Sequence, residues 1–112
     1  MEAIPRYRFE RLVRDALDQL PDELLSILDN VVIQVDDRNP EEPSLLGLYD
    51  GVPHSDRNGD TGPDVISIYR LAHCEAVIDE TELAAEVTVT VIHEIAHAAG
   101  IDDERLDELG WG

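Results

Sequence analysis

Apolar residues recur every three or four positions near the start of the chain. Within and just after the segment Tyr7–Gln19 they occupy six such positions: Phe9, Leu12, Val13, Ala16, Leu17 and Leu20. This period predicts an amphipathic helix. We expect the helix to stop at Pro21, because proline lacks the backbone N–H that a further turn needs. The segment DELLSILDN that follows predicts a second, short helix.

Three short segments further along each predict a β-strand, and the first of them is a β-branched run. Their sequences are VVIQVDD (31–37), LLGLYDG (45–51) and DVISIYR (64–70). The segment LAHCEAVI (71–78) is expected to be a short connection. No internal repeat or linker interrupts the pattern, so a chain of 112 residues predicts a single domain over residues 1–112.

The polar segment VPHSDRNGDTGP (52–63) separates the second and third predicted strands. Its Asp and Asn residues recur at every second position, as they do in some calcium-binding loops. An EF-hand loop, however, requires glycine at its sixth position and glutamate at its twelfth. Thr61 and Ser67 stand at those positions here. We therefore expect a turn-rich loop, with His54 exposed at its entrance.

The residues from Val87 to Ile92 alternate in a way that favours a strand, but the histidines that follow favour a helix. At 100° per residue, His93 and His97 project about 40° apart on one helical face, whereas on a strand they would lie about 13 Å apart. Asp79, with Glu82 three residues later, is a capping-box pattern, and a glycine follows Ala99 as a stop. We predict one helix over residues 80–99, with this core stripe: Ala84, Thr88, Val91, Ile92, Ile95 and Ala99.

The charge balance narrows the classes of partner. The chain has 26 acidic and 8 basic residues, a net charge of −18. Such a field repels phosphate backbones and anionic membrane surfaces, so we expect no nucleic acid and no membrane as partners. The start of the chain lacks the apolar stretch of a signal peptide, and no segment is apolar enough to span a bilayer. The expectation is a cytoplasmic protein.

Two smaller features have structural interpretations. Four of the eight basic residues, all arginines, fall in the first 14 positions and are expected to form a solvated, ion-paired helix face: Arg6, Arg8, Arg11 and Arg14. The single cysteine, Cys74, excludes an internal disulfide and is expected to be a small apolar filler. His73 precedes it, but adjacent residues on one element point apart.

The segment HEIAHAAGIDD carries the candidate metal-site residues. Two neutral imidazoles at positions i and i+4 supply two ligands for a divalent ion, for which zinc is the best choice, although other first-row ions also accept such ligands. Glu94 is turned about 100° from the first histidine, so it is placed as a general base rather than a ligand. Gly100 permits a sharp turn that brings Asp103 back as the third ligand, with Asp102 as the alternative. The competing interpretation of Asp103 is an N-cap for a last short helix.

The pattern H-E-x-x-H-x-x-G-x-x-D resembles the motif of zincin metallopeptidases, in the metzincin spacing but with aspartate in place of the third histidine. GLYDGVP, ISIYR and TVIHEIAHAAGIDDERLDELGW resemble the small bacterial minimal zincins, and the likeness runs from about Phe9 to the C-terminus. The resemblance implies a compact α+β fold with a small mixed sheet of about three or four strands. It also implies Zn²⁺ bound by His93, His97 and Asp103, Glu94 as the catalytic base, and a peptide or protein substrate that pairs with an edge strand.

The chain departs from the larger relatives in two ways, and the second favours an alternative function. The only methionine is Met1, so no methionine-containing turn follows the motif, and only nine residues follow Asp103, too few for a lower subdomain. The alternative is a non-proteolytic metal- or peptide-binding regulatory protein that retains a zincin site. Glu94 favours the zinc-dependent metallopeptidase, because binding alone does not need a base. Glu94, Asp103 and the net charge also argue against a metal-dependent ribonuclease with a similar histidine string.

Peptide hydrolysis also needs a group that stabilises the oxyanion. Tyr49 and Tyr69 offer a phenol for this purpose and Arg70 a guanidinium. For each of the three a structural role is the favoured interpretation.

Overall fold

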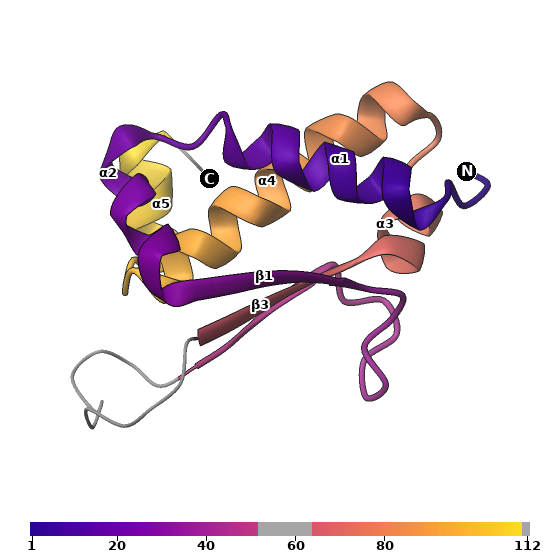
Figure 1. Ribbon diagram of the computed structural model, residues 1–112. Helices are drawn as coiled ribbons and strands as arrows, with labels where there is room; N and C mark the ends of the chain where they lie inside the picture. The colour runs from indigo at the N-terminus through magenta and orange to yellow at the C-terminus, as the bar shows by residue number, and fades with distance from the viewer. Residues whose placement is uncertain (52–63, 111–112) are drawn as a thin grey trace.

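A computed structural model describes residues 1–51 and 64–110. The described strands follow one another in the chain, between a first and a last group of helices, and form one small mixed sheet, so the fold is α+β, as predicted (Figure 1). In chain order the elements are α1 (Arg6–Leu17), α2 (Asp22–Leu25), η1 (Ser26–Asn30), β1 (Val31–Asp36), β2 (Gly47–Asp50), β3 (Asp64–Tyr69), α3 (Arg70–Ala76), α4 (Glu80–Ala98) and α5 (Asp103–Leu109). The predicted polar loop with His54 lies outside the described residues.

The three described strands form one sheet in the order β1-β3-β2. β1 runs parallel to β3, with Val31 opposite Asp64, and β2 runs antiparallel to β3, with Gly47 opposite Ile68. The central strand β3 is the most buried of the three, and Ile66 and Ile68 are fully buried. This arrangement leaves β2 as an edge strand.

Helices α1 and α4 lie on the same side of the sheet (Figure 1) and pack against each other. The core is made mainly by the buried faces of these two helices and by β3. Phe9 and Val13 from α1 meet Val87 and Val91 from α4 in the same cluster. The apolar period of residues 7–20 therefore predicts α1 correctly, with its solvated side carrying Arg6 and other exposed arginines.

The core stripe predicted for α4 is wrong in part. Val91 and Ile95 are buried as expected, but Ala84, Thr88, Ile92 and Ala99 are only half-buried. The buried line instead runs through Leu83, Val87, Val91, Ile95 and Ala98. The physical reason is that α4 is covered from several directions, since it contacts α1, α3, β2 and β3, so its buried arc is not the single stripe opposite the histidines.

The helix prediction for residues 80–99 is confirmed despite the β-branched run. The Asp79 side chain accepts a hydrogen bond from the Glu82 backbone N–H (2.9 Å), which satisfies one of the free donors of the first turn. The Glu82 carboxylate accepts from the N–H of Ile78 (3.4 Å). Burial along α4 offsets the weak intrinsic propensity of valine and threonine.

Two local predictions need correction. The supposed connection over residues 71–78 contains α3, whose buried residues Ala72, His73 and Cys74 span less than one turn and so give no visible period. The predicted helix over residues 22–30 divides into α2 and the 3₁₀ helix η1.

Among the described helices, none is long and apolar enough to cross a membrane.

Candidate metal centre

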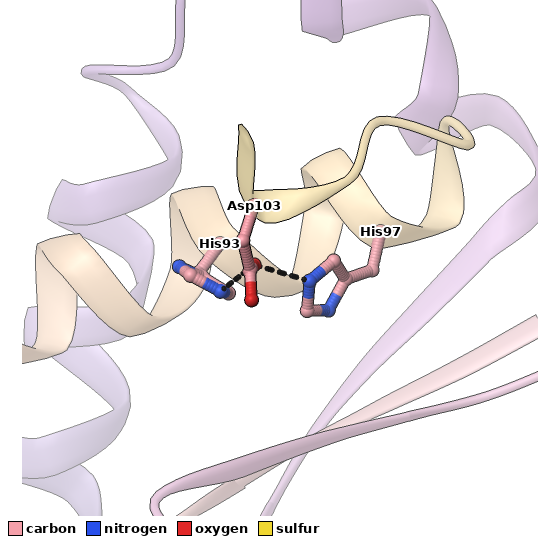
Figure 2. A group of neighbouring side chains, drawn as sticks. All are labelled: His93, His97 and Asp103. Atoms are coloured by element: carbon pink, nitrogen blue, oxygen red, sulfur yellow. Dashed lines mark hydrogen bonds and ion pairs between the residues drawn. The ribbon is translucent and has the colours of Figure 1, made fainter. Parts of the chain in front are cut away.

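The last turns of α4 and the start of α5 bring three side chains together at the surface. Oδ1 of Asp103 lies 2.7 Å from Nε2 of His93 and 3.1 Å from Nε2 of His97. Figure 2 shows both rings pointing toward the carboxylate from the same side of α4. One potential ligand atom from each residue lies within 4.8 Å of the others. We call these three residues the His/His/Asp group.

A tight turn after α4 produces this convergence. Gly100 adopts a left-handed conformation (φ 81°), which costs glycine no Cβ clash. Its N–H donates to the carbonyl of His97 (2.9 Å), and the N–H of Ile101 donates to the carbonyl of Ala96 (2.9 Å). This pair of bonds is the Schellman motif. It reverses the chain sharply enough for α5 to begin beside the histidines.

The two aspartates after this turn have different roles. Asp102 is the N-cap of α5, because its side chain accepts a hydrogen bond from the N–H of Arg105 (2.8 Å). Asp103 is the first helical residue and directs its carboxylate at the two imidazoles. The capping role considered for Asp103 therefore falls to Asp102, and Asp103 is the aspartate of the His/His/Asp group.

The imidazoles also favour the ionised form of the Asp103 carboxylate. The hydrogen bond with His97 holds the pKa of Asp103 below its ordinary value of 3.8, and His93 adds to this effect. Asp103 is therefore an anion at neutral pH, which is the state required of a carboxylate metal ligand.

Glu94 lies next to the His/His/Asp group without being part of it. Its side chain is 14% exposed, and its Oε1 lies 3.5 Å from Nδ1 of His97. Together with His93, Glu94 lines a groove of about 380 Å³ between α4 and the start of β2. The other lining residues are Glu42, Ser44, Leu45, Leu46, Gly47, Glu86, Val89 and Thr90.

A comparison with protein-family models matches residues 28–111 to the family described as zincin-like metallopeptidase. The chain belongs to the zincin-like metallopeptidase family. The matched region includes the three described strands and the whole His/His/Asp group, whereas α1 and α2 precede it. A comparison with curated proteins found no match.

Membership of the zincin-like family implies zinc binding, and the donor set fits that ion. Zinc in proteins is bound by imidazole nitrogen and carboxylate oxygen, and a catalytic zinc takes three protein ligands. The His/His/Asp group offers two imidazole nitrogens and one carboxylate oxygen within 4.8 Å. A peptidase family also implies a peptide or protein substrate.

The three candidates for oxyanion stabilisation all have partners within the zincin-like fold. The Tyr49 hydroxyl donates to the carboxylate of Asp64 (2.7 Å), and the Tyr69 hydroxyl accepts from the amide of Asn39 (3.0 Å). Arg70 donates to the carboxylate of Asp37 (2.9 Å) and to the carbonyl of Ile4 (2.7 Å). Since none of the three is among the groove-lining residues described above, these contacts support the structural roles that the sequence favours.

Sequence reasoning missed a buried network beside the groove. Nδ1 of His73 lies 2.9 Å from the carbonyl oxygen of Tyr69, and its Nε2 lies 2.9 Å from the hydroxyl of Thr90. Because a carbonyl only accepts, Nδ1 of His73 carries the proton in the neutral ring. The Thr90 hydroxyl has two acceptors within reach, Nε2 of His73 and the carbonyl oxygen of Glu86 at 3.0 Å, and its single proton is donated to one of them at a time. Burial lowers the pKa of His73 below 6.5, although the Tyr69 carbonyl and Glu86 oppose this effect. A threonine in an apolar helix gave no signal of this contact.

Proposed function

We propose that this protein is a zinc-dependent metallopeptidase in which His93, His97 and Asp103 hold the metal and Glu94 is the general base. The observation that carries the proposal is the convergence of two imidazole Nε2 atoms on Oδ1 of Asp103, at 2.7 and 3.1 Å. Glu94 lies beside this group but is not one of its three members. A general base that does not bind the metal requires such a position.

The protein residues divide the reaction between them. A zinc ion supplies Lewis-acid chemistry, which polarises a carbonyl oxygen and lowers the pKa of water. The Glu94 carboxylate accepts a proton from the attacking water and returns it to the nitrogen of the leaving amine. The half-buried position of Glu94 shields this transfer from bulk solvent, which strengthens the electrostatic interactions of its charge.

The groove and the edge strand support a peptide as substrate. Within the described residues β2 pairs with β3 alone, and its first residue lines the groove that contains His93 and Glu94. An extended peptide adds to such an edge through main-chain hydrogen bonds. A peptide bound in this way passes beside the carboxylate of Glu94.

One observation favours the alternative, metal or peptide binding without turnover. The side chain of Asp103 is 73% exposed, so this side of the site is open and restrains a substrate weakly. Both functions require zinc binding, and only the peptidase requires Glu94 as a base. The Glu94→Gln variant separates them, because glutamine keeps the shape of the side chain but cannot accept the proton.

The experiment compares zinc content and cleavage of a peptide library, detected by mass spectrometry. We expect Glu94→Gln to keep its zinc and to lose about 10²- to 10⁴-fold in cleavage rate. The matched control is Glu75→Gln, an exposed carboxylate on α3 that pairs with Arg38, which should cleave at the wild-type rate. If zinc-loaded wild-type protein cleaves no peptide, or if Glu94→Gln cleaves as fast as wild type, the peptidase proposal is wrong.

A further inference from the structure

Gly47 begins the edge strand β2 and lies against Thr90 and Glu94 of α4. A Cβ atom built at Gly47 would lie 2.7 Å from Cγ2 of Thr90, 3.2 Å from Cγ of Glu94 and 3.3 Å from the carbonyl oxygen of Ser67. The first distance is shorter than the non-bonded contacts between carbon atoms that proteins show. Any side chain at position 47 therefore requires one of its neighbours to move.

The Thr90 side of this contact is held in place. Thr90 is 6% exposed, and its hydroxyl lies 2.9 Å from Nε2 of His73 and 3.0 Å from the carbonyl oxygen of Glu86. Rotating Cγ2 away from Gly47 would carry the hydroxyl away from both partners. His73 is itself fully buried, and an unsatisfied buried polar group is costly, so Thr90 resists displacement.

The strand side is held as well. Gly47 pairs with Ile68 of the central strand β3, and the carbonyl of the preceding residue, Leu46, accepts a hydrogen bond from the N–H of Tyr69 (2.9 Å). Moving β2 outward would break ladder hydrogen bonds beside a buried strand. Of the three neighbouring atoms, Cγ of Glu94 belongs to the side chain with the most rotational freedom.

We propose that Gly47 is a positioning residue for Glu94. The absence of a side chain at position 47 leaves room for the Glu94 side chain, whose carboxylate lies beside His97. Thr90 and His73 form the fixed wall on the other side of this space. A side chain at position 47 strains the 2.7 Å contact with Thr90, and it also pushes the Glu94 side chain, the freest of the three neighbours, out of its place. This inference rests on the proposed role of Glu94 as the base, and it adds the residue that fixes where that base stands.

The test uses Gly47→Ala, Thr90→Ser and the double variant. Thr90→Ser removes Cγ2 and keeps the hydroxyl that meets His73. We expect Gly47→Ala to keep its zinc while kcat falls about tenfold or more, since small misplacements of catalytic groups are costly, and the melting temperature also falls. The double variant should recover the melting temperature of Thr90→Ser, because the closest contact is gone. Its kcat should stay low, because the contact with Glu94 remains.

A role of Gly47 in packing alone gives a different pattern: kcat and melting temperature would recover together in the double variant, and that result overturns the proposal. If Gly47→Ala does not fold, the double variant is compared with Thr90→Ser alone. A kcat for Gly47→Ala within twofold of wild type also overturns the proposal.

A second measurement does not depend on activity. The ¹³C signals of the glutamate γ-methylenes are recorded in zinc-free protein, and that of Glu94 is assigned by its loss in Glu94→Gln. We expect this signal to shift in Gly47→Ala and in the double variant relative to Thr90→Ser. An unchanged signal overturns the positioning role. A shifted signal in a protein that hydrolyses no peptide refutes the peptidase proposal and leaves the positioning role intact.

Discussion

The histidines on α3 and α4 occupy two contrasting environments. His73 on α3 is fully buried, and both of its ring nitrogens have partners within the fold, the Tyr69 carbonyl and the Thr90 hydroxyl. His93 and His97 on α4 are about one-third exposed (33% and 34%), and their Nε2 atoms face the same carboxylate oxygen of Asp103. All three residues are imidazoles on helices, yet only two of them present nitrogen to a common point at the surface.

The contrast shows what separates a structural histidine from a metal-binding candidate. A buried imidazole whose two nitrogens are both hydrogen-bonded within the fold has a structural role, because no nitrogen lone pair is left for a metal ion. Imidazoles that converge with a carboxylate at the surface place several donors where one ion can meet them. The aspartates repeat the contrast, since Asp102 caps α5 whereas Asp103 faces the imidazoles.

The largest effect on stability should come from removing the buried histidine. His73→Ala leaves a cavity and strips the Thr90 hydroxyl and the Tyr69 carbonyl of a partner, so we expect a loss of about 3 kcal/mol in the free energy of unfolding. Urea denaturation of zinc-free protein measures it. Zinc stoichiometry should not change. The matched variant His93→Ala should show the reverse pattern, with little loss of stability and loss of zinc, and His73→Ala losing zinc at unchanged stability would contradict the contrast.

The two neighbouring aspartates allow a second comparison, with a smaller effect. Asp102→Ala removes the N-cap of α5 and should cost about 1 kcal/mol in zinc-free protein. Asp103→Ala removes an exposed side chain and should change stability by less than about 0.5 kcal/mol, but it should weaken zinc binding. Thermal denaturation and zinc titration of both variants provide the check. If Asp102→Ala loses zinc and Asp103→Ala loses stability, their roles are exchanged.

The smallest effect concerns pH. Because burial lowers the pKa of His73 below 6.5 in the folded state, the unfolded chain binds more protons between the folded-state value and pH 6.5. The contribution of neutral His73 to stability is therefore complete above pH 6.5, and it is lost as the pH falls through the folded-state pKa. As the pH is lowered from 7.5 to 5, the urea midpoint of zinc-free protein should decrease less steeply in His73→Gln than in wild type. An equal slope in the two proteins would show that His73 does not cause the decline.

Much of the fold is readable from local pattern, and α4 shows why. Residues 87–92 alternate like a strand, but the cap at Asp79 and the glycine at position 100 mark both ends of a helix, and these signals decide correctly. The rotation of the buried arc toward Leu83 and Val87 could not be predicted, because it depends on contacts with α1, α3 and two strands. α3 was missed because it is short and its buried residues are consecutive.

The candidate site, too, is predictable from the sequence only in part. The spacing of His93 and His97 predicts their common face, and the turn at Gly100 predicts that an aspartate returns to it. Which aspartate returns depends on the geometry of the turn, since either residue makes an acceptable N-cap. The roles of Glu94 and of the three ligands stay predictions. The contact of Gly47 with α4 could not be read from the sequence, because the two segments meet only in the folded protein.

The central claim is that the His/His/Asp group binds zinc. The most direct test is the metal content of protein purified without chelator, measured by mass spectrometry for wild type, His97→Ala and Asp103→Ala. The prediction is about one zinc per chain in wild type, none in His97→Ala and a weakened occupancy in Asp103→Ala, with the Glu75→Gln control unchanged. Wild-type protein that takes up no metal from micromolar zinc, or a His97→Ala variant that retains its zinc, would contradict the claim.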